Sequence, residues 1–475
     1  MANGLINLLT RLPPDERGKL CEEQHGWIRQ QIDLVGGWLP HIDSAYRPKL
    51  VGAYRFDAPT SHALQRLAEA VGALFHALGA KIHDDSEILS PSEFWDLYSF
   101  LAIPPAYHDA LDSLPTRYFS TPLIRPDVLL DKEGRPWIAE VNTGSVGGVE
   151  DLLIYLEYLL IRAASLSPEE AEAVRGQKAR LLATLKLWLD RQYDLFLRRR
   201  ETPRGRPFGA KPTICVVYAD REDSFFVAKY LAAIFAHLGY RTLHCRPEHL
   251  RLDGDRLCVE APVSREKIPI DIVYRDFIFE EMFAGEEGGY AFHEEFAAFL
   301  TAAQRELALV LNPLQDFLLR SKAAIPALYE EKAFDTRALA AARDRFAEFS
   351  PRTQFARPGL DFGGDMVLKP TLGHSGREVL TDRERVAAKL NNAPPEDLYP
   401  HWIVQQKVDV EEDLTLFALE SGIAEQRLRC AHGLLIHNVG DGWRATGVLT
   451  KCGIGEVINF SGGAQLVPGL LHGGI

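Results

Sequence analysis

The clearest chemical potential in this chain lies in an arginine followed by three oxygen-bearing side chains: Arg125, Asp127, Glu140 and Asn142. Side chains alternate between the two faces of a β-strand, so the arginine and the aspartate would share one face of a first strand. The glutamate and the asparagine would likewise share one face of a second. Two carboxylates and an amide oxygen suit octahedral Mg²⁺, which prefers hard oxygen ligands and often binds nucleotide phosphates at the same time. The arginine would then face a phosphate group in transfer.

A β-hairpin and a glycine run must position these groups. The sequence DKEG at 131–134 predicts a four-residue turn between the two strands, with Leu129 and Ile138 next in the two polar rows. The alternative is a surface hairpin that carries only an arginine–carboxylate pair, which is common. The run TGSVGG at 143–148 favours the metal site, because backbone N–H groups in such a run can bind an anion.

Two lysines farther along the chain could bind the same phosphates. Asp365–Pro370 predicts a strand bearing Lys369, and the glycine-rich loop TLGHSGRE follows it directly. This loop is neither a Walker A loop nor a GxSxG nucleophile elbow. Lys322 follows an Asn-Pro turn in a helical pattern, where a solvent-exposed lysine is the alternative. Trp402–Leu414 indicates either a buried strand entering an acidic loop or a hinge that could bind adenine and ribose.

The composition indicates a globular protein with small-molecule partners. Its 475 residues, 46% hydrophobic and 25% charged, predict two or three domains. The net charge of -13 opposes non-specific nucleic-acid binding, which needs basic residues. The six cysteines form no CxxC pair and are expected to be reduced. With no signal-peptide pattern and no apolar run of membrane-spanning length, we expect a soluble cytoplasmic protein without a membrane partner.

Hydrophobic periodicity divides the chain into three parts. Residues 1–205 form a helical N-terminal region that also contains the hairpin at 123–148, and a Pro-, Gly- and Arg-rich linker follows at 201–212. Residues 206–320 alternate strand and helix patterns, which predicts a Rossmann-like domain with a parallel sheet. Residues 321–475 carry strands separated by glycine-rich or acidic loops and are expected to be α+β. The predicted fold class is therefore α/β.

In this order the segments resemble the circularly permuted ATP-grasp proteins, a group that includes glutathionylspermidine synthetase-like carboxylate–amine ligases. The resemblance extends from about Leu123 to about Pro468. In the usual ATP-grasp order the metal-binding pattern, an acid followed by Glu-x-Asn, comes last. Here the Arg-x-Asp and Glu-x-Asn patterns precede both lysines, and the Rossmann-like module lies between these patterns and the first lysine. The resemblance implies a circularly permuted α+β ATP-grasp fold with a Rossmann-like pre-ATP-grasp domain.

The resemblance also implies a role for individual residues. The hairpin arginine, Arg125, would be catalytic, and the magnesium ligands would be Asp127, Glu140 and Asn142. With the glycine loop included, the ATP-binding set is Lys322, Lys369, Gly373, Ser375, Gly376, Gln405, Gln406, Lys407 and Val408. The substrate-binding candidates are Arg275, Lys451, Gly462 and Gly463. After the last two glycines the sequence AQLVPGLL departs from the polar stretch usual in the family, which leaves the acceptor-side contacts open.

In ATP-grasp ligases the γ-phosphoryl group of ATP passes to a substrate carboxylate, and an amine attacks the resulting acyl phosphate. The resemblance therefore implies a ligase that uses ATP and Mg²⁺ and joins small-molecule or peptide carboxylates to amines. Two alternatives stay open, a non-catalytic nucleotide-binding protein with this fold and an ATP-grasp phosphotransferase. The first 120 residues match no part of the family, and a homodimer is compatible with the sequence.

Overall fold

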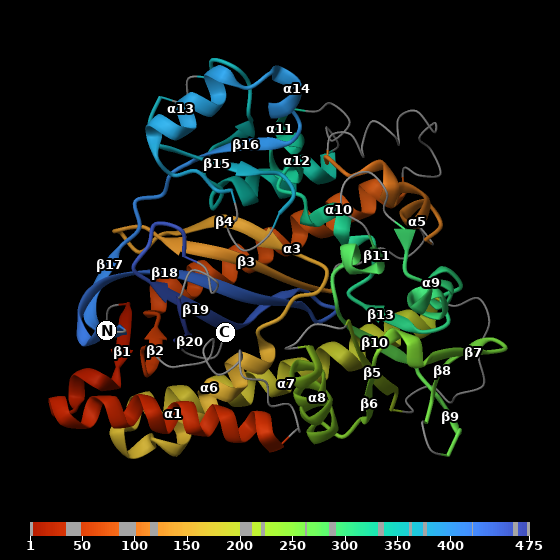
Figure 1. The fold of residues 1–475 in the computed structure, drawn as a ribbon, viewed down its shortest axis with the longest axis horizontal. Coiled ribbons are helices and arrows are strands. Elements are labelled where there is room, and N and C mark those ends of the chain that lie inside the picture. The colour runs from red at the N-terminus through yellow and green to blue at the C-terminus, as the bar shows by residue number, and fades with distance from the viewer. Residues whose placement is uncertain are drawn as a thin grey trace.

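The computed structural model describes residues 3–34, 49–84, 101–114, 122–199, 211–219, 224–261, 264–284, 291–330, 337–360, 363–373, 378–419, 421–458 and 464–472. The fold over these residues is mixed α/β, as the sequence predicts. Figure 1 shows a large central sheet with helices beneath it, a smaller sheet above it and a parallel sheet at one side. Most of the predicted linker at 201–212 lies outside the described residues.

Eight strands form the largest sheet, in the order β1–β2–β20–β19–β18–β3–β4, with β17 paired to β18 off this path. They are β1 Gly4–Asn7, β2 Gly52–Arg55, β3 Leu123–Leu130, β4 Pro136–Asn142, β17 Glu412–Leu419, β18 Gly422–Asn438, β19 Trp443–Gly453 and β20 Gln465–Leu470. Strand β3 pairs antiparallel with β18, so the hairpin β3–β4 belongs to the same sheet as the C-terminal strands. The N-terminal region and the end of the chain therefore build one structural unit.

Helices cover both faces of this sheet. They are α1 Pro14–Leu34, α3 Ala58–Asp84, α6 Val149–Ile161 and α7 Pro168–Arg199. Neighbouring residues of β18 point to opposite faces of the sheet. Leu434 and Ile436 pack in the core with α3, whereas Leu435 packs with α6 and α7. A strand buried on both faces is continuously apolar. For this reason the second half of β18 lacks a regular alternation of apolar and polar residues.

A four-stranded parallel sheet lies at the side, in the order β13–β10–β5–β6. Its elements are β5 Thr213–Tyr218, α8 Ser224–His237, β6 Arg241–Cys245, β10 Ile272–Asp276, α9 Ala297–Gln304 and β13 Leu309–Leu311. Helix α8 ends before Gly239, whose φ of 89° favours glycine. The short antiparallel strands β7 Leu250–Asp253, β8 Arg256–Glu260 and β9 Lys267–Pro269 extend from this side of the molecule.

A small antiparallel sheet lies above the large one, in the order β14–β16–β15. Its elements are β14 Thr353–Phe355, β15 Met366–Pro370, α13 Arg383–Asn392, α14 Pro395–Leu398 and β16 Trp402–Gln406. Leu368 and Val404 of the sheet pack with Val386 and Leu390 of α13 in a separate apolar core. Residues 407–411 connect β16 to β17, so this short segment joins the two sheets.

The other described elements connect these layers. They are α5 His108–Asp112, β11 Phe283–Ala284, β12 Ala291–Phe292, α10 Asp316–Arg320, α11 Ala324–Glu330 and α12 Arg337–Ala347. Helix α12 packs against α3, and beside this contact the guanidinium of Arg66 lies over the ring of Phe349. In the part of the chain that the structure describes, no helix has both the length and the apolar character needed to cross a bilayer.

Helix α3 approaches the large sheet closely at Gly72, which gives a test of this packing. A Cβ atom at Gly72 would lie 2.1 Å from Cδ2 of Trp443, whereas one at Gly18 in α1 would meet no atom within 4 Å. Gly72→Ala should therefore destabilise the fold by about 1–3 kcal/mol through overpacking. Gly18→Ala, the matched control, should stabilise it by about 0.5–1 kcal/mol through helix propensity. Equal thermal unfolding midpoints for the two variants would contradict the close approach.

Candidate active site

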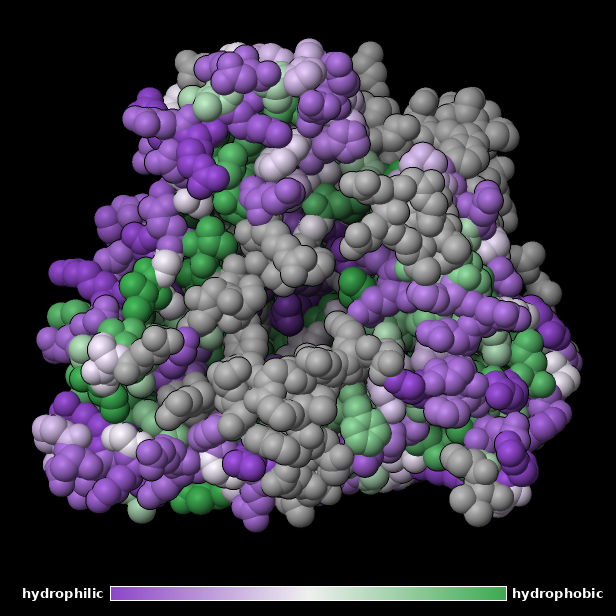
Figure 2. Space-filling view, in the orientation of Figure 1, coloured by the Kyte–Doolittle hydropathy of each residue, from purple (hydrophilic) through white to green (hydrophobic). Residues whose placement is uncertain are grey.

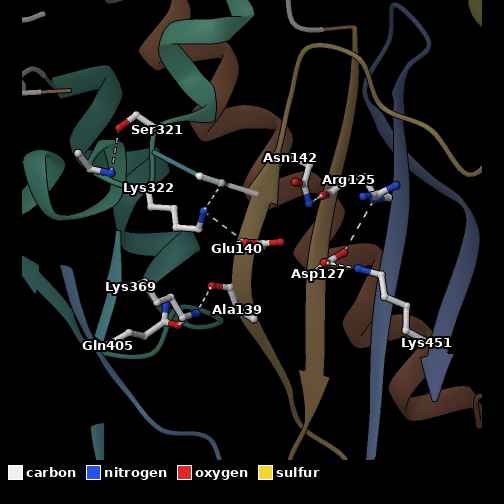
Figure 3. Close-up of polar contacts among 12 residues, drawn as sticks. Arg125, Asp127, Ala139, Glu140, Asn142, Ser321, Lys322, Lys369, Gln405 and Lys451 are labelled. Carbon is white, nitrogen blue, oxygen red and sulfur yellow. Dashed lines mark hydrogen bonds and ion pairs between the residues drawn. The ribbon is translucent and has the colours of Figure 1, made fainter. Parts of the chain in front are cut away.

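Strands β3 and β4 place the four predicted polar residues in two facing pairs. Arg125 lies opposite Asn142, and Asp127 lies opposite Glu140. Residues directly opposite each other on antiparallel strands share one face of the sheet. Figure 3 shows these side chains on the neighbouring strands, with Lys322 and Lys369 on one side and Lys451 on the other. The Asn142 amide nitrogen donates to the Arg125 carbonyl at 3.1 Å.

A β-bulge ends this polar row earlier than the sequence predicts. The register shifts so that Val128 pairs with Ile138, which leaves Ala139 as the extra residue of β4. Leu129 lies on the cavity side, but Ile138 is fully buried in the core on the opposite face. The prediction that Ile138 continues the polar row is therefore wrong, because one inserted residue reverses the strict alternation. The Ala139 carbonyl accepts a hydrogen bond from Lys369 Nζ at 2.9 Å.

Asp127 is a buried carboxylate held between two cations. Its Oδ2 accepts a hydrogen bond from Lys451 Nζ at 2.6 Å, and its Oδ1 lies 3.8 Å from Arg125 Nε. Burial raises the pKa of Asp127, but the attraction of Lys451 and Arg125 outweighs burial and holds this pKa below its usual value. Among the described residues, the buried Oδ1 has no hydrogen-bond partner. An unsatisfied buried oxygen of this kind fits the coordination of a cation.

Glu140 faces a lysine that comes from a different part of the chain. Lys322 Nζ lies 3.5 Å from Glu140 Oε2 and donates to the Gly373 carbonyl at 3.0 Å. The side chain of Lys322 is only 12% exposed, so the alternative of a solvent-exposed lysine is wrong. The residue lies between α10 and α11, and its N–H donates to the Thr371 carbonyl at 2.9 Å. Both contacts attach Lys322 to the start of the glycine loop.

Lys369 is a buried residue of β15, and its side chain reaches from the small sheet to the hairpin. Its Nζ donates to Gln405 Oε1 at 2.6 Å as well as to the Ala139 carbonyl. Burial lowers the pKa of Lys369 to about 8, although the charge of Glu140 acts in the opposite direction. At neutral pH the side chain therefore remains mostly protonated. The contact brings an ammonium group of the small sheet next to the carboxylate hairpin of the large one.

The predicted hinge lines the same space but uses some of its backbone donors internally. The N–H of Gln406 donates to the Arg352 carbonyl at 2.9 Å, and the N–H of Lys407 donates to the Asp365 carbonyl at 3.0 Å. A base bound here would have to use other backbone groups. Lys407 Nζ lies 3.2 Å from a carboxylate oxygen of Glu456.

These residues line a cavity of about 1330 Å³ between the two sheets. This volume exceeds the 300–1,000 Å³ range of typical ligand pockets and leaves room for more than one small substrate. Figure 2 shows the hollow near the middle of this face, with hydrophilic residues at its floor. The lining contains the predicted residues Arg125, Asp127, Glu140, Asn142, Lys369, Gly373, Gln405, Gln406, Lys407, Val408 and Lys451. Four other candidates, Ser375, Gly376, Gly462 and Gly463, lie outside the described residues.

Several charged residues of the lining were not found by sequence reasoning. They are Lys132, Glu150, Asp151, Asp276, Asp365, Arg427, Arg429 and Glu456, whereas the lining acids Asp409, Glu411 and Glu412 belong to the predicted hinge segment. Two signals could have indicated some of them: the alternate positions of the two arginines on β18, and the two acids that follow the glycine run after Val149. The N–H of Gly148 donates to Glu150 Oε1 at 3.1 Å, and the Gly147 carbonyl accepts from Arg125 at 2.7 Å. Part of the glycine run thus binds protein groups.

The donor set of the hairpin fits one class of metal ion. Among the described residues, no group of three or more His, Cys, Asp and Glu side chains could hold a metal. The hairpin instead offers two carboxylates and the amide oxygen of Asn142. A small hard cation such as Mg²⁺ is usually bound by one or two carboxylates, and it takes its remaining ligands from water and phosphate. Asp127, Glu140 and Asn142 therefore fit Mg²⁺ better than they fit zinc, which prefers nitrogen and sulfur ligands.

The structure does not bring Arg275 into the cavity. This residue of β10 is 2% exposed, and its guanidinium donates to the carbonyls of Phe277, Asn312 and Pro313 at 2.7, 3.2 and 3.4 Å. Burial lowers its pKa to about 10, against the favourable charge of Asp316. Arg275 therefore connects the end of a parallel strand to the segment before α10.

This placement predicts a stability role for Arg275. Arg275→Met would leave three carbonyls without their donor and Asp316 without its nearby cation, so we expect a loss of about 3–5 kcal/mol in the free energy of unfolding. Arg444→Met, at a half-exposed position, should change stability by less than about 0.5 kcal/mol. Urea unfolding measures both. Wild-type stability of the Arg275 variant would contradict this role.

Comparisons with known proteins identify a similar fold. No protein-family model matches the chain, and no curated protein sequence matches it. The glutathione synthetase-like effector GSS30 from Globodera pallida, solved in its apo form, aligns with a TM-score of 0.61 at 11% identity. The alignment covers 97% of this chain and 98% of that one. A candidate gamma-glutamylcysteine synthetase from Methylobacillus flagellatus KT aligns with a TM-score of 0.37 at 11% identity, over 84% and 87% of the two chains. The first alignment shows that the two proteins share a fold over nearly their whole lengths.

Proposed function

We propose that this protein is an ATP-dependent carboxylate–amine ligase with a circularly permuted ATP-grasp fold. It would form an amide bond through an acyl phosphate and release ADP and phosphate. The observation that carries this proposal is the convergence of three oxygen ligands from β3 and β4 with Lys369 around one cavity between two sheets, with Lys322 beside Glu140. The fold shared with a glutathione synthetase-like protein supports it.

The order of the segments supports the permuted arrangement. The metal-binding hairpin precedes both lysines in the chain, and the Rossmann-like sheet is inserted between the hairpin and the first lysine. Nevertheless, β3 pairs with β18, so the hairpin lies beside strands that follow the lysines in sequence. This topology agrees with an ATP-grasp core whose metal-binding segment has moved to the N-terminal side. It also agrees with the resemblance to glutathionylspermidine synthetase-like ligases.

The proposed roles follow from the position of each group. Mg²⁺ held by Asp127, Glu140 and Asn142 would supply charge neutralisation for the ATP phosphates. Lys369, from the small sheet, and Lys322, from the segment between α10 and α11, point two ammonium groups toward the hairpin. Phosphoryl transfer depends mainly on positioning and electrostatic stabilisation, which such fixed cations supply. The carboxylate of the substrate that is to be joined to the amine would accept the γ-phosphoryl group within the same cavity.

Arg125 is suited to the transferring phosphate because its orientation is fixed. Its Nη1 donates to the Gly147 carbonyl at 2.7 Å, while its Nε lies near Asp127. The guanidinium is therefore held at the edge of the carboxylate pair, where negative charge would develop during transfer. A preorganised cation in this position stabilises the transition state more than the bound substrate.

The reaction class is tested by measuring ADP release from Mg-ATP with pooled carboxylates, with and without pooled amines. A ligase should show amine-dependent ADP release and a new amide mass, and both should be lost in Glu140→Ala. ADP release without amine dependence would support the phosphotransferase. ATP binding without turnover across the pools would support the non-catalytic protein.

The role of Arg125 gives a separate prediction. Arg125→Ala should lower turnover about 10²–10³-fold while ATP binding changes little, because the guanidinium acts mainly in the transition state. Arg427→Ala removes a cavity-lining arginine whose side chain is 71% exposed and serves as the matched control. Single-turnover kinetics and calorimetric ATP binding separate the two effects. Undiminished turnover in Arg125→Ala would remove this residue from the mechanism.

A further inference from the structure

The proposed metal-binding carboxylates are already paired with lysines of the protein itself. Lys451 contacts Asp127 at 2.6 Å, and Lys322 lies 3.5 Å from Glu140. The two lysines come from different elements and reach the hairpin from opposite sides, as Figure 3 shows. Their side chains are 14% and 12% exposed, so little water screens either pair. Each proposed metal-binding carboxylate thus has an ammonium group beside it.

The charged groups next to the two hairpin carboxylates are positive, although the whole chain has a net charge of -13 and acids such as Glu150 and Asp151 also line the cavity. Arg125, Lys322, Lys369 and Lys451 face the two carboxylates, which gives an excess of two positive charges. Burial is the main cause of the lowered pKa of Lys369, and the charge of Lys322 adds to it. The cations therefore repel one another at this site. A free divalent cation would meet the same repulsion, whereas a polyphosphate would be attracted.

We propose that Lys322 and Lys451 compete with the divalent cation for Glu140 and Asp127, so that this site takes up the metal only together with a nucleotide polyphosphate. The phosphate oxygens would receive the two ammonium groups as the metal replaces them at the carboxylates. This inference rests on the proposed function, which identifies the cavity as a nucleotide and metal site. It assigns to the two lysines a role in selecting the metal–nucleotide complex over the free metal ion.

If the lysines compete with the metal, removing either one should change the affinity for the metal and the affinity for the nucleotide in opposite directions. Removing one ammonium group frees a carboxylate for the metal, so metal binding without nucleotide should become tighter. The same change removes a partner of the phosphates, so nucleotide binding without metal should become weaker. A lysine that only supports the structure would weaken both when it is removed. The sign of the two changes therefore separates competition from a general loss of structure.

The test uses the full chain with Mn²⁺ and ADP as probes, which require no turnover. Mn²⁺ binding without nucleotide is measured by electron paramagnetic resonance, and ADP binding in the presence of EDTA by calorimetry. Lys451→Met and Lys322→Met should each tighten Mn²⁺ binding about 10-fold or more and weaken metal-free ADP binding about 10-fold, a change of about 1.4 kcal/mol in each. Lys132→Met is the control, because Lys132 lines the same cavity but pairs with Asp409. It should change neither affinity.

The outcomes distinguish this inference from the proposed function. If wild type binds neither Mn²⁺ nor ADP under any condition, including both together, the nucleotide site fails and the inference with it. If wild type binds both ligands but the lysine variants bind Mn²⁺ no more tightly, the competition is overturned and the ligase proposal stands. Lys322→Met keeps the test decisive if Lys451→Met does not fold, because Glu140 is 31% exposed and tolerates the loss of its partner better than buried Asp127.

Discussion

The antiparallel pairing of β3 with β18 is the contact on which the candidate site depends. It places Asp127 beside Gly433 and joins the β3–β4 hairpin to strands that lie about 300 residues farther along the chain. A Cβ atom at Gly433 would lie 3.1 Å from Cδ of Arg125, so the glycine gives the arginine room to lie across the strand. Because β19 is the next strand, Lys451 also reaches the hairpin. One long-range pairing thus brings Lys451 to the carboxylates and makes room for Arg125.

The second constraint is the attachment of the small sheet to this assembly. The bulge at Ala139 leaves a carbonyl that accepts from Lys369, and the isolated bridge between Asp131 and Val410 joins the hairpin turn to the hinge. The two sheets that enclose the cavity are therefore connected both at the hairpin and at the hinge. The cavity walls come from separate parts of the chain, but these contacts position them directly.

Charged side chains gather on the cavity side of the large sheet, whereas the buried histidines of β18 are neutral. On the cavity side, Lys322 and Lys451 are paired with the carboxylates Glu140 and Asp127. On the other side of β18 lies His432, whose ring bonds Thr450 and whose pKa is lowered to about 3 by burial. His437 bonds Thr446 and has a pKa of about 3 for the same reason. Both histidines remain neutral and contribute to packing, so they are not acid–base groups at physiological pH.

The sequence by itself determined the local features of this protein: the mixed α/β class, the hairpin with its turn, and the polar row of Arg125 and Asp127, because alternation along a strand is a short-range property. Tertiary structure decided which groups meet. It turned Ile138 into the core through one inserted residue, directed Arg275 inward toward three carbonyls, and paired Lys451 with an aspartate 324 positions away. Such contacts depend on strand register and on burial far along the chain. No local periodicity encodes either one.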